Sequence, residues 1–130
     1  MEVIRPRQNA TRRGPAEWFT GDVWMDSIST GPHVRLFSVH FTPGARTAWH
    51  RHPFGQTLHV TEGAGLAQVR GGPIEPIRAG DTVHFEPNEE HWHGADPENF
   101  MTHLAMQEIA DDGSDATWGE HVTDAEYGGR

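Results

Sequence analysis

Histidines are the residues of this chain whose type and spacing could do chemistry. His50 and His52 stand two residues apart in the stretch GARTAWHRHPFGQTLHVTEG, and Gln56 follows four residues after His52. If this stretch runs into a strand, both imidazoles point to one face, because side chains alternate across a strand. His91 comes later, in GDTVHFEPNEEHWHG, where a strand and a proline turn would bring it opposite the first pair. Imidazoles grouped in this way suit a borderline divalent metal.

The segment FMTHLAMQEI carries a second pair of polar side chains. Alternation places His103 and Gln107 on the same face as Met101 and Ala105. Two polar groups that point into an apolar interior must be paired or serve a function. We therefore expect His103 to act as a general base and Gln107 to hold a reacting group by hydrogen bonds. The alternative is a histidine whose nitrogens are satisfied within the core.

Short segments rich in β-branched and aromatic residues, separated by glycine and proline, must position these side chains. This pattern predicts an all-β sandwich or barrel. An early strand or edge segment is expected at 14–26, an acidic loop at 111–115, and one helical turn from the capping-box spacing of Thr123 and Glu126. The expected strands are 33–41, 56–62, 65–70, 81–86 and 100–109.

Composition narrows the class of protein. The chain has 130 residues, which suits one domain, and it has no cysteine, so disulfides and thiolate ligands are excluded. The net charge of -9 argues against a nucleic-acid partner. No apolar run is long enough for a membrane span, and we expect a soluble cytoplasmic protein. The basic residues near the N-terminus are interpreted as a solvated leader: Arg5, Arg7, Arg12 and Arg13.

The histidine motifs resemble those of the cupins. The spacing Gly44-x5-His50-x-His52-x3-Gln56-x6-Gly63 is similar to the first cupin motif, with Gln56 where the family usually has Glu. Gly80-x10-His91 resembles the second motif more loosely. The resemblance implies an all-β, single-domain cupin jelly-roll barrel with short peripheral helical turns. It implies one domain over 1–130, with a core at about 33–109, an N-terminal strand or arm at 1–32 and a C-terminal tail at 110–130. The implied metal ligands are His50, His52, Gln56 and His91.

A narrower resemblance covers nearly the whole chain. The runs GPAEWFTG, EEHWHGA, MTHLAMQE and EHVTDAEY, together with the first motif, look like the small bacterial cupin hydroxynitrile lyases. This resemblance implies one divalent metal per chain, held by three His and one Gln. Mn²⁺ is expected first, with Fe²⁺, Ni²⁺ and Zn²⁺ as alternatives. It also implies a small-molecule substrate, a cyanohydrin that is cleaved to an aldehyde or ketone and hydrogen cyanide.

The resemblance also indicates which side chains would line a substrate pocket. It turns Phe37 and Val39 inward, whereas His40 and His59 face out. His93 shares the parity of His91, so it would line the mouth of the pocket or support a ligand. Trp49 and Trp92 are expected to pack, and His33, His84 and His121 to be structural or exposed. The expected substrate pocket consists of Phe37, Val39, Phe54, Leu58 and His93.

Neutral Gln56 in place of a carboxylate affects the chemistry of such a site. Neutral ligands leave the full charge of a divalent cation on the site, which favours polarising an oxygen over activating dioxygen. A lyase is therefore preferred. A cupin dioxygenase using Fe or Mn and a non-enzymatic small-molecule-binding cupin are the alternatives. We also expect a homo-oligomer, a dimer or tetramer, because Leu104 and Met106 would otherwise need a second sheet to cover them.

Overall fold

The computed structural model describes residues 1–5 and 8–130, so Arg7 of the predicted basic leader lies outside the described residues. Its regular structure is almost entirely strand, which confirms the predicted all-β class. Among the described residues, no helix is long and apolar enough to cross a membrane. The elements in chain order are β1 (Arg12–Arg13), β2 (Phe19–Thr20), β3 (Val23–Thr30), β4 (Val34–Phe41), β5 (Arg46–Thr47), β6 (His50–Arg51), β7 (Gln56–Val69), β8 (Glu75–Arg78), β9 (Thr82–Phe85), β10 (His91–Ala95), β11 (Met101–Glu108), β12 (Thr117–Trp118) and α1 (Asp124–Tyr127).

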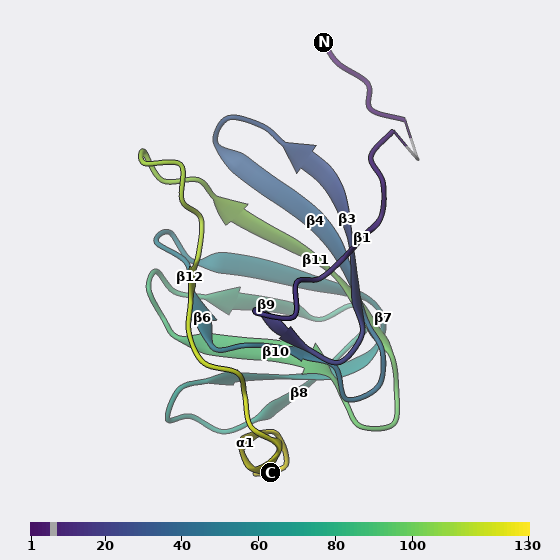
Figure 1. The fold of residues 1–130 in the computed structure, drawn as a ribbon, viewed down its shortest axis with the longest axis vertical. Coiled ribbons are helices and arrows are strands. Elements are labelled where there is room, and N and C mark those ends of the chain that lie inside the picture. Colours follow the sequence, from purple (N-terminus) through teal and green to yellow (C-terminus); the bar gives the residue numbers. More distant parts are fainter. Residues whose placement is uncertain (6–7) are drawn as a thin grey trace.

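The strands form a curled, barrel-like sheet in two halves (Figure 1). In one half, β1, β3, β4 and β11 pair in that order and end on the first part of β7, which also pairs with β9. In the other half, the second part of β7 pairs with β8 and β10. β10 pairs in turn with β5 and with β6; β5 pairs further with β2, and β6 with β12. The pairs are antiparallel, as in a jelly roll.

β7 corrects the prediction of two separate strands at 56–62 and 65–70. Strand pairing continues through Gly63, where the chain changes sheets, so β7 is a single strand, Gln56–Val69. Gly63 has φ +80, and a Cβ built on it would lie 1.9 Å from the carbonyl oxygen of Phe100. Thr61 is an extra residue in the β7–β11 register, since Thr102 faces Glu62 and His103 faces Val60. The glycine and the bulge bend the strand rather than end it.

Gly63→Ala should therefore be strongly destabilising. We expect it to lower the free energy of unfolding by about 2–5 kcal/mol, from the left-handed backbone plus the clash with Phe100. Gly113→Ala is the matched control, because Gly113 also has positive φ (86) but nothing lies within 4 Å of its Cβ position. It should cost only about 1–2 kcal/mol. Urea unfolding of both variants measures the difference, and equal losses would show that the close approach at Gly63 is unimportant.

The other predicted elements agree with the structure to different degrees. The segment at 14–26 is not one strand: β2 and the start of β3 are separated by Gly21, whose φ is +81. β8 and β10 were not predicted, because EPIR and HWHGA are short and contain proline or glycine. The helical turn α1 is confirmed, with the reciprocal hydrogen bonds of a capping box between Thr123 and Glu126.

The core has two parts, and the C-terminal tail belongs to the second. Phe41, Leu58 and Met101 are fully buried between the two halves of the sheet. Trp49 and Trp92 lie in a second cluster that Tyr127 of α1 completes. α1 lies at the lower end of the molecule in Figure 1. The Tyr127 hydroxyl donates to the carbonyl of Ala95 at 2.6 Å. The end of the C-terminal tail therefore packs against the barrel.

Candidate active site

The predicted histidines converge at the junction of β6 and β10. His50 begins β6 and His91 begins β10, and the two are direct partners across that strand pair. The ring centroids of His50 and His91 are 4.4 Å apart, and those of His50 and His52 are 5.1 Å apart. All three residues are at least 98 % buried. The strand, turn and return predicted from the sequence thus bring His91 opposite the first pair.

Backbone carbonyls fix the orientation of each of these rings. Nδ1 of His50 donates to Ala48 at 2.9 Å, Nδ1 of His52 to Asp115 at 2.6 Å, and Nδ1 of His91 to Glu89 at 2.7 Å. Because a carbonyl only accepts, the proton of each neutral ring sits on Nδ1 and the lone pair on Nε2. Buried Nε2 of His52 has no hydrogen-bond partner among the described residues. Proteins orient metal-binding histidines in this way.

Gln56, the first residue of β7, adds an oxygen to the same place. Its Oε1 lies 3.0 Å from Nε2 of His91, while its Nε2 donates to Oε1 of Gln107 at 3.2 Å. The side chain of Gln56 also lies close enough to His50 and His52 to raise the pKa of both rings slightly against the larger effect of burial. An imidazole lone pair and an amide oxygen are both acceptors, so they repel each other unless a cation lies between them and their neighbours. These residues therefore fit a divalent metal.

His93 is closer to this cluster than the sequence indicated. The ligand atoms of His50, His91 and His93 lie within 4.8 Å of one another. Nδ1 of His93 is 2.9 Å from Nε2 of His103, so one proton is shared between these rings. Within the described part of the chain, the buried Nε2 of His93 and Nδ1 of His103 have no partner. His93 is thus a candidate ligand as well as a pocket residue, and its shared parity with His91 was the signal.

Burial keeps these imidazoles neutral. Desolvation is the main cause in every case, and it lowers the pKa of His91 to about 3 and the pKa of His103 to about 4. The pKa values of His50 and His93 lie well below 6.5, first because of burial and then because neighbouring histidines disfavour a second positive charge. The pKa of His52 is also lowered by burial. Neutral rings are the form that binds a metal or accepts a proton.

The same shifts predict acid sensitivity of the metal-free protein. Below pH 6.5 the unfolded chain binds protons at His91 and His103. In the folded chain these two rings stay neutral until the pH approaches about 3 for His91 and about 4 for His103. The contribution of these two histidines to the free energy of unfolding is therefore fully present above pH 6.5. It falls as the pH drops, by about 1.4 kcal/mol per pH unit for each histidine. Urea unfolding in a chelator between pH 7 and 4.5 measures the slope. A flat profile would contradict neutral burial.

A cavity of about 180 Å³ opens above the histidines. Phe37 and Val39 form part of its wall, as predicted, together with His93, His103 and Gln107. The structure does not bring every expected residue to it. Phe54 sits at the exposed turn closed by Gly55 (φ +81), on a separate outer groove, and Leu58 is fully buried in the core.

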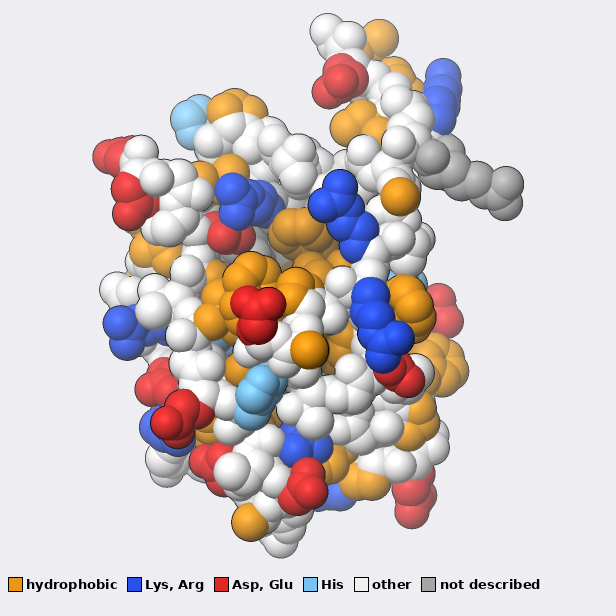
Figure 2. Space-filling model, viewed as in Figure 1, with side chains coloured by type: hydrophobic (Ala, Val, Ile, Leu, Met, Phe, Trp, Pro, Cys, Tyr) orange, Lys and Arg blue, Asp and Glu red, His pale blue; other side chains and the backbone are white. Residues whose placement is uncertain are grey.

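Two tryptophans and a charged pair take the place of the missing wall residues. Trp18 and Trp118 stack at 5.0 Å, and Arg35 and Asp115 pair at 2.6 Å beside them. Figure 2 shows hydrophobic side chains gathered near the middle of this face, between the N-terminal segment and the C-terminal tail of Figure 1. The only sequence signal for the tail's part was one aromatic residue, Trp118, within the acidic run DDGSDATWGE.

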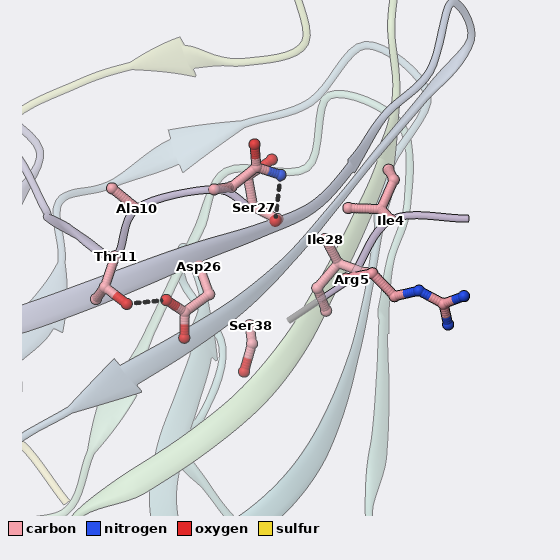
Figure 3. Close-up of a pocket in the computed structure, with 9 residues that line it drawn as sticks. Ile4, Arg5, Ala10, Thr11, Asp26, Ser27, Ile28 and Ser38 are labelled. Carbon is pink, nitrogen blue, oxygen red and sulfur yellow. Dashed lines mark hydrogen bonds between the residues drawn. The ribbon is translucent and has the colours of Figure 1, made fainter. Parts of the chain in front are cut away.

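A larger pocket, about 590 Å³, lies outside the barrel between the N-terminal arm and β3 (Figure 3). Thr11 on the arm donates a hydrogen bond to Asp26, and Ile4 and Ile28 lie nearby. Its described lining contains no histidine and no cluster of metal-binding groups. The smaller cavity, which is lined by His50, His52, His93 and His103, is therefore the candidate site.

Comparisons with known proteins agree with this geometry. The Cupin domain family matches residues 37–103, a span that includes all five clustered histidines. The chain is 54 % identical, over 98 % of both chains, to a protein named (R)-mandelonitrile lyase from Granulicella tundricola. A cupin-like protein of Thermotoga maritima is 37 % identical, with a TM-score of 0.85 over 95 % of each chain. A polyketide cyclase from Streptomyces resistomycificus shares the fold alone, at 13 % identity and a TM-score of 0.75 over 98 % of this chain and 90 % of that one. With the histidine cluster, the barrel and this similarity in agreement, the chain belongs to the cupin family.

Proposed function

We propose that this cupin is a metal-dependent hydroxynitrile lyase, which cleaves a cyanohydrin to an aldehyde or ketone and hydrogen cyanide. The observation that carries the proposal is the convergence of imidazole lone pairs and the Gln56 oxygen at the floor of a cavity with aromatic walls. The (R)-mandelonitrile lyase of Granulicella tundricola, similar over nearly the whole chain, supports the reaction class.

In this proposal the metal is held by His50, His52, Gln56 and His91, with His93 beside them. One divalent ion per chain is expected, Mn²⁺ first and Fe²⁺, Ni²⁺ or Zn²⁺ as alternatives. When bound, it supplies Lewis acidity that lowers the pKa of the substrate hydroxyl. These donors are all neutral, so they leave its positive charge uncompensated.

The proton of the substrate hydroxyl is assigned to the His93–His103 pair. His103 lines the cavity and is neutral at pH 7, so it can accept this proton. Its contact with His93 spreads the new charge over two rings. Cleavage of the carbon–carbon bond leaves the carbonyl product and a cyanide anion, and His103 returns the proton to cyanide, so that hydrogen cyanide leaves and the base is restored.

Gln107 and the walls position the substrate. One N–H of the Gln107 amide is used by Asp115, and the second remains to hydrogen-bond the nitrile or the departing cyanide. Phe37, Val39 and Trp118 provide apolar surface for an aryl or alkyl group. The aromatic character of this wall favours an aryl cyanohydrin as the test substrate.

The decisive experiment combines metal content with turnover. Purified protein is analysed for transition metals and then assayed for cyanide release from mandelonitrile, with oxygen uptake recorded in parallel. Cyanide release that depends on bound metal and consumes no oxygen supports the proposal. Oxygen consumption with turnover would instead indicate a dioxygenase, and bound metal and ligand without product would indicate a binding protein.

Assembly and location extend the proposal. The outer face of the β3–β4–β11 sheet exposes Trp24, Ile28 and Met106 by 39–45 % each, and Leu104 is half-buried there. We propose that a second copy covers this face in a dimer or tetramer, which the mass of the protein in solution would test. A cytoplasmic location is proposed from the absence of cysteine, which suits a reducing compartment.

A further inference from the structure

A continuous line of polar side chains connects the metal-binding cluster to a charged pair at the rim of the cavity. Gln56 Oε1 faces His91, and Gln56 Nε2 donates to Gln107 at 3.2 Å. Gln107 Nε2 in turn donates to Oδ2 of Asp115 at 2.9 Å, and Oδ1 of Asp115 accepts from Arg35 at 2.6 Å. Gln56, Gln107 and Asp115 are mostly buried, so these bonds are poorly replaced by water.

The chemistry of the three groups makes this line directional. A glutamine amide has a donor end and an acceptor end of nearly the same shape, so packing alone does not decide which way it points. A carboxylate has no donor. Asp115 therefore accepts only the nitrogen end of Gln107, which leaves the oxygen end of Gln107 for Gln56. That oxygen accepts only the nitrogen end of Gln56, which leaves the Gln56 oxygen for the cluster.

We propose that Asp115 is a positioning residue that sets the orientation of Gln56, through Gln107, so that an oxygen and not an NH₂ group faces the metal. This inference rests on the proposed role of Gln56 as a ligand. The backbone carbonyl of Asp115 also receives Nδ1–H of His52 at 2.6 Å, so one loop residue orients two ligands. Arg35 holds the carboxylate in place.

The consequence of reversing the line is large because an amide nitrogen has no lone pair for a cation. In Asp115→Asn the side chain keeps its shape but offers either end to Gln107, so both orientations of Gln56 become accessible. Loss of a group that orients a ligand typically weakens metal binding about 10–100-fold. We expect a loss of this size in the dissociation constant for Mn²⁺. Asp112→Asn is the matched control, since Asp112 is exposed on the same loop and accepts hydrogen bonds from Ser114.

A second background separates orientation from charge. Asp115→Asn also removes a negative charge near the cation, and that effect would weaken binding whichever residue stands at position 56. In Gln56→Glu the ligand has oxygen at both ends, so its orientation no longer matters. We therefore expect Asp115→Asn to weaken Mn²⁺ binding about 10–100-fold in the Gln56 protein and less than about 3-fold in the Gln56→Glu protein.

The experiment is a titration of metal-free protein with Mn²⁺, following free Mn²⁺ by electron paramagnetic resonance, with circular dichroism to confirm folding. Gln107→Met serves as a second way to break the line if Asp115→Asn does not fold, and the same dependence on residue 56 is expected of it. Unchanged affinity of the folded single variants, or equal losses in both backgrounds, would overturn the inference. Failure of the unsubstituted protein and of Gln56→Glu to bind Mn²⁺ would overturn the proposed metal site itself.

Discussion

His91→Ala protein is expected to emerge from purification almost free of divalent metal and to release almost no cyanide from mandelonitrile. His91 is fully buried, its ring is held by Glu89, and its Nε2 faces the Gln56 oxygen. The substitution removes one of few donors and leaves the remaining imidazoles too few to hold the ion. His50→Ala should behave in the same way, because His50 is the direct strand partner of His91. Elemental analysis and cyanide assays measure both effects.

Two comparisons make this result specific. His33→Ala removes an exposed histidine and should keep both the metal and the activity. Gln56→Ala should lose less metal than either histidine variant, since a neutral amide oxygen binds a transition metal more weakly than imidazole does. Full metal occupancy in both His50→Ala and His91→Ala would mean that the ion binds elsewhere.

Strand alternation explains why much of the site could be predicted from the sequence. On β11, His103 and Gln107 face inward with Met101 and Ala105, as the period of two requires. On β4, Val39 is buried, whereas His40 lies outside and bonds Asp26 and Thr102. Once a strand and one of its buried residues are known, alternation tells which of its other side chains face inward.

The parts that could not be predicted depend on turns and on contacts between distant segments. Strand alternation does not place Phe54, because this residue lies in the turn at Gly55 and its side chain is exposed. Asp115 and Trp118 reach the cavity only because β12 pairs with β6, a pairing between residues far apart in the chain. Two-residue strands such as β12 have too short a pattern to be recognised, so the places of Asp115 and Trp118 on the cavity wall could not be predicted.

The loop that carries Asp115 is important because residue 56 is Gln and not the Glu that is usual in cupins. A carboxylate ligand presents an oxygen in either orientation, whereas an amide does not. In the proposed site, the hydrogen bonds from Asp115 through Gln107 would orient the oxygen of Gln56. Under this proposal, a neutral ligand at position 56 also requires the carboxylate of Asp115, which accepts from Gln107. In the proposed site, a neutral Gln56 would leave the metal a stronger Lewis acid, which suits proton removal from a hydroxyl, and the proton acceptor beside it is the next residue to test.

His103→Ala is expected to bind metal normally and yet cleave mandelonitrile about 10²–10⁴-fold more slowly. Removal of a positioned general base typically has an effect of this size. The ring of His103 is fully buried, lines the cavity and contacts His93, but it is not one of the proposed ligands His50, His52, Gln56 and His91. Metal content should therefore stay near that of the unsubstituted protein, which separates this variant from His91→Ala.

A control and a second readout distinguish the loss of a base from a loss of structure. His40→Ala removes a histidine from the outer face of the neighbouring strand and should leave the rate unchanged. In His103→Ala the rate constant should fall much more than the Michaelis constant changes, because Phe37 and Val39 still bind the substrate. A fully metallated His103→Ala protein with a nearly normal rate would rule out His103 as the base. The proton would then pass to His93, whose Nε2 also lines the cavity and has no hydrogen-bond partner among the described residues.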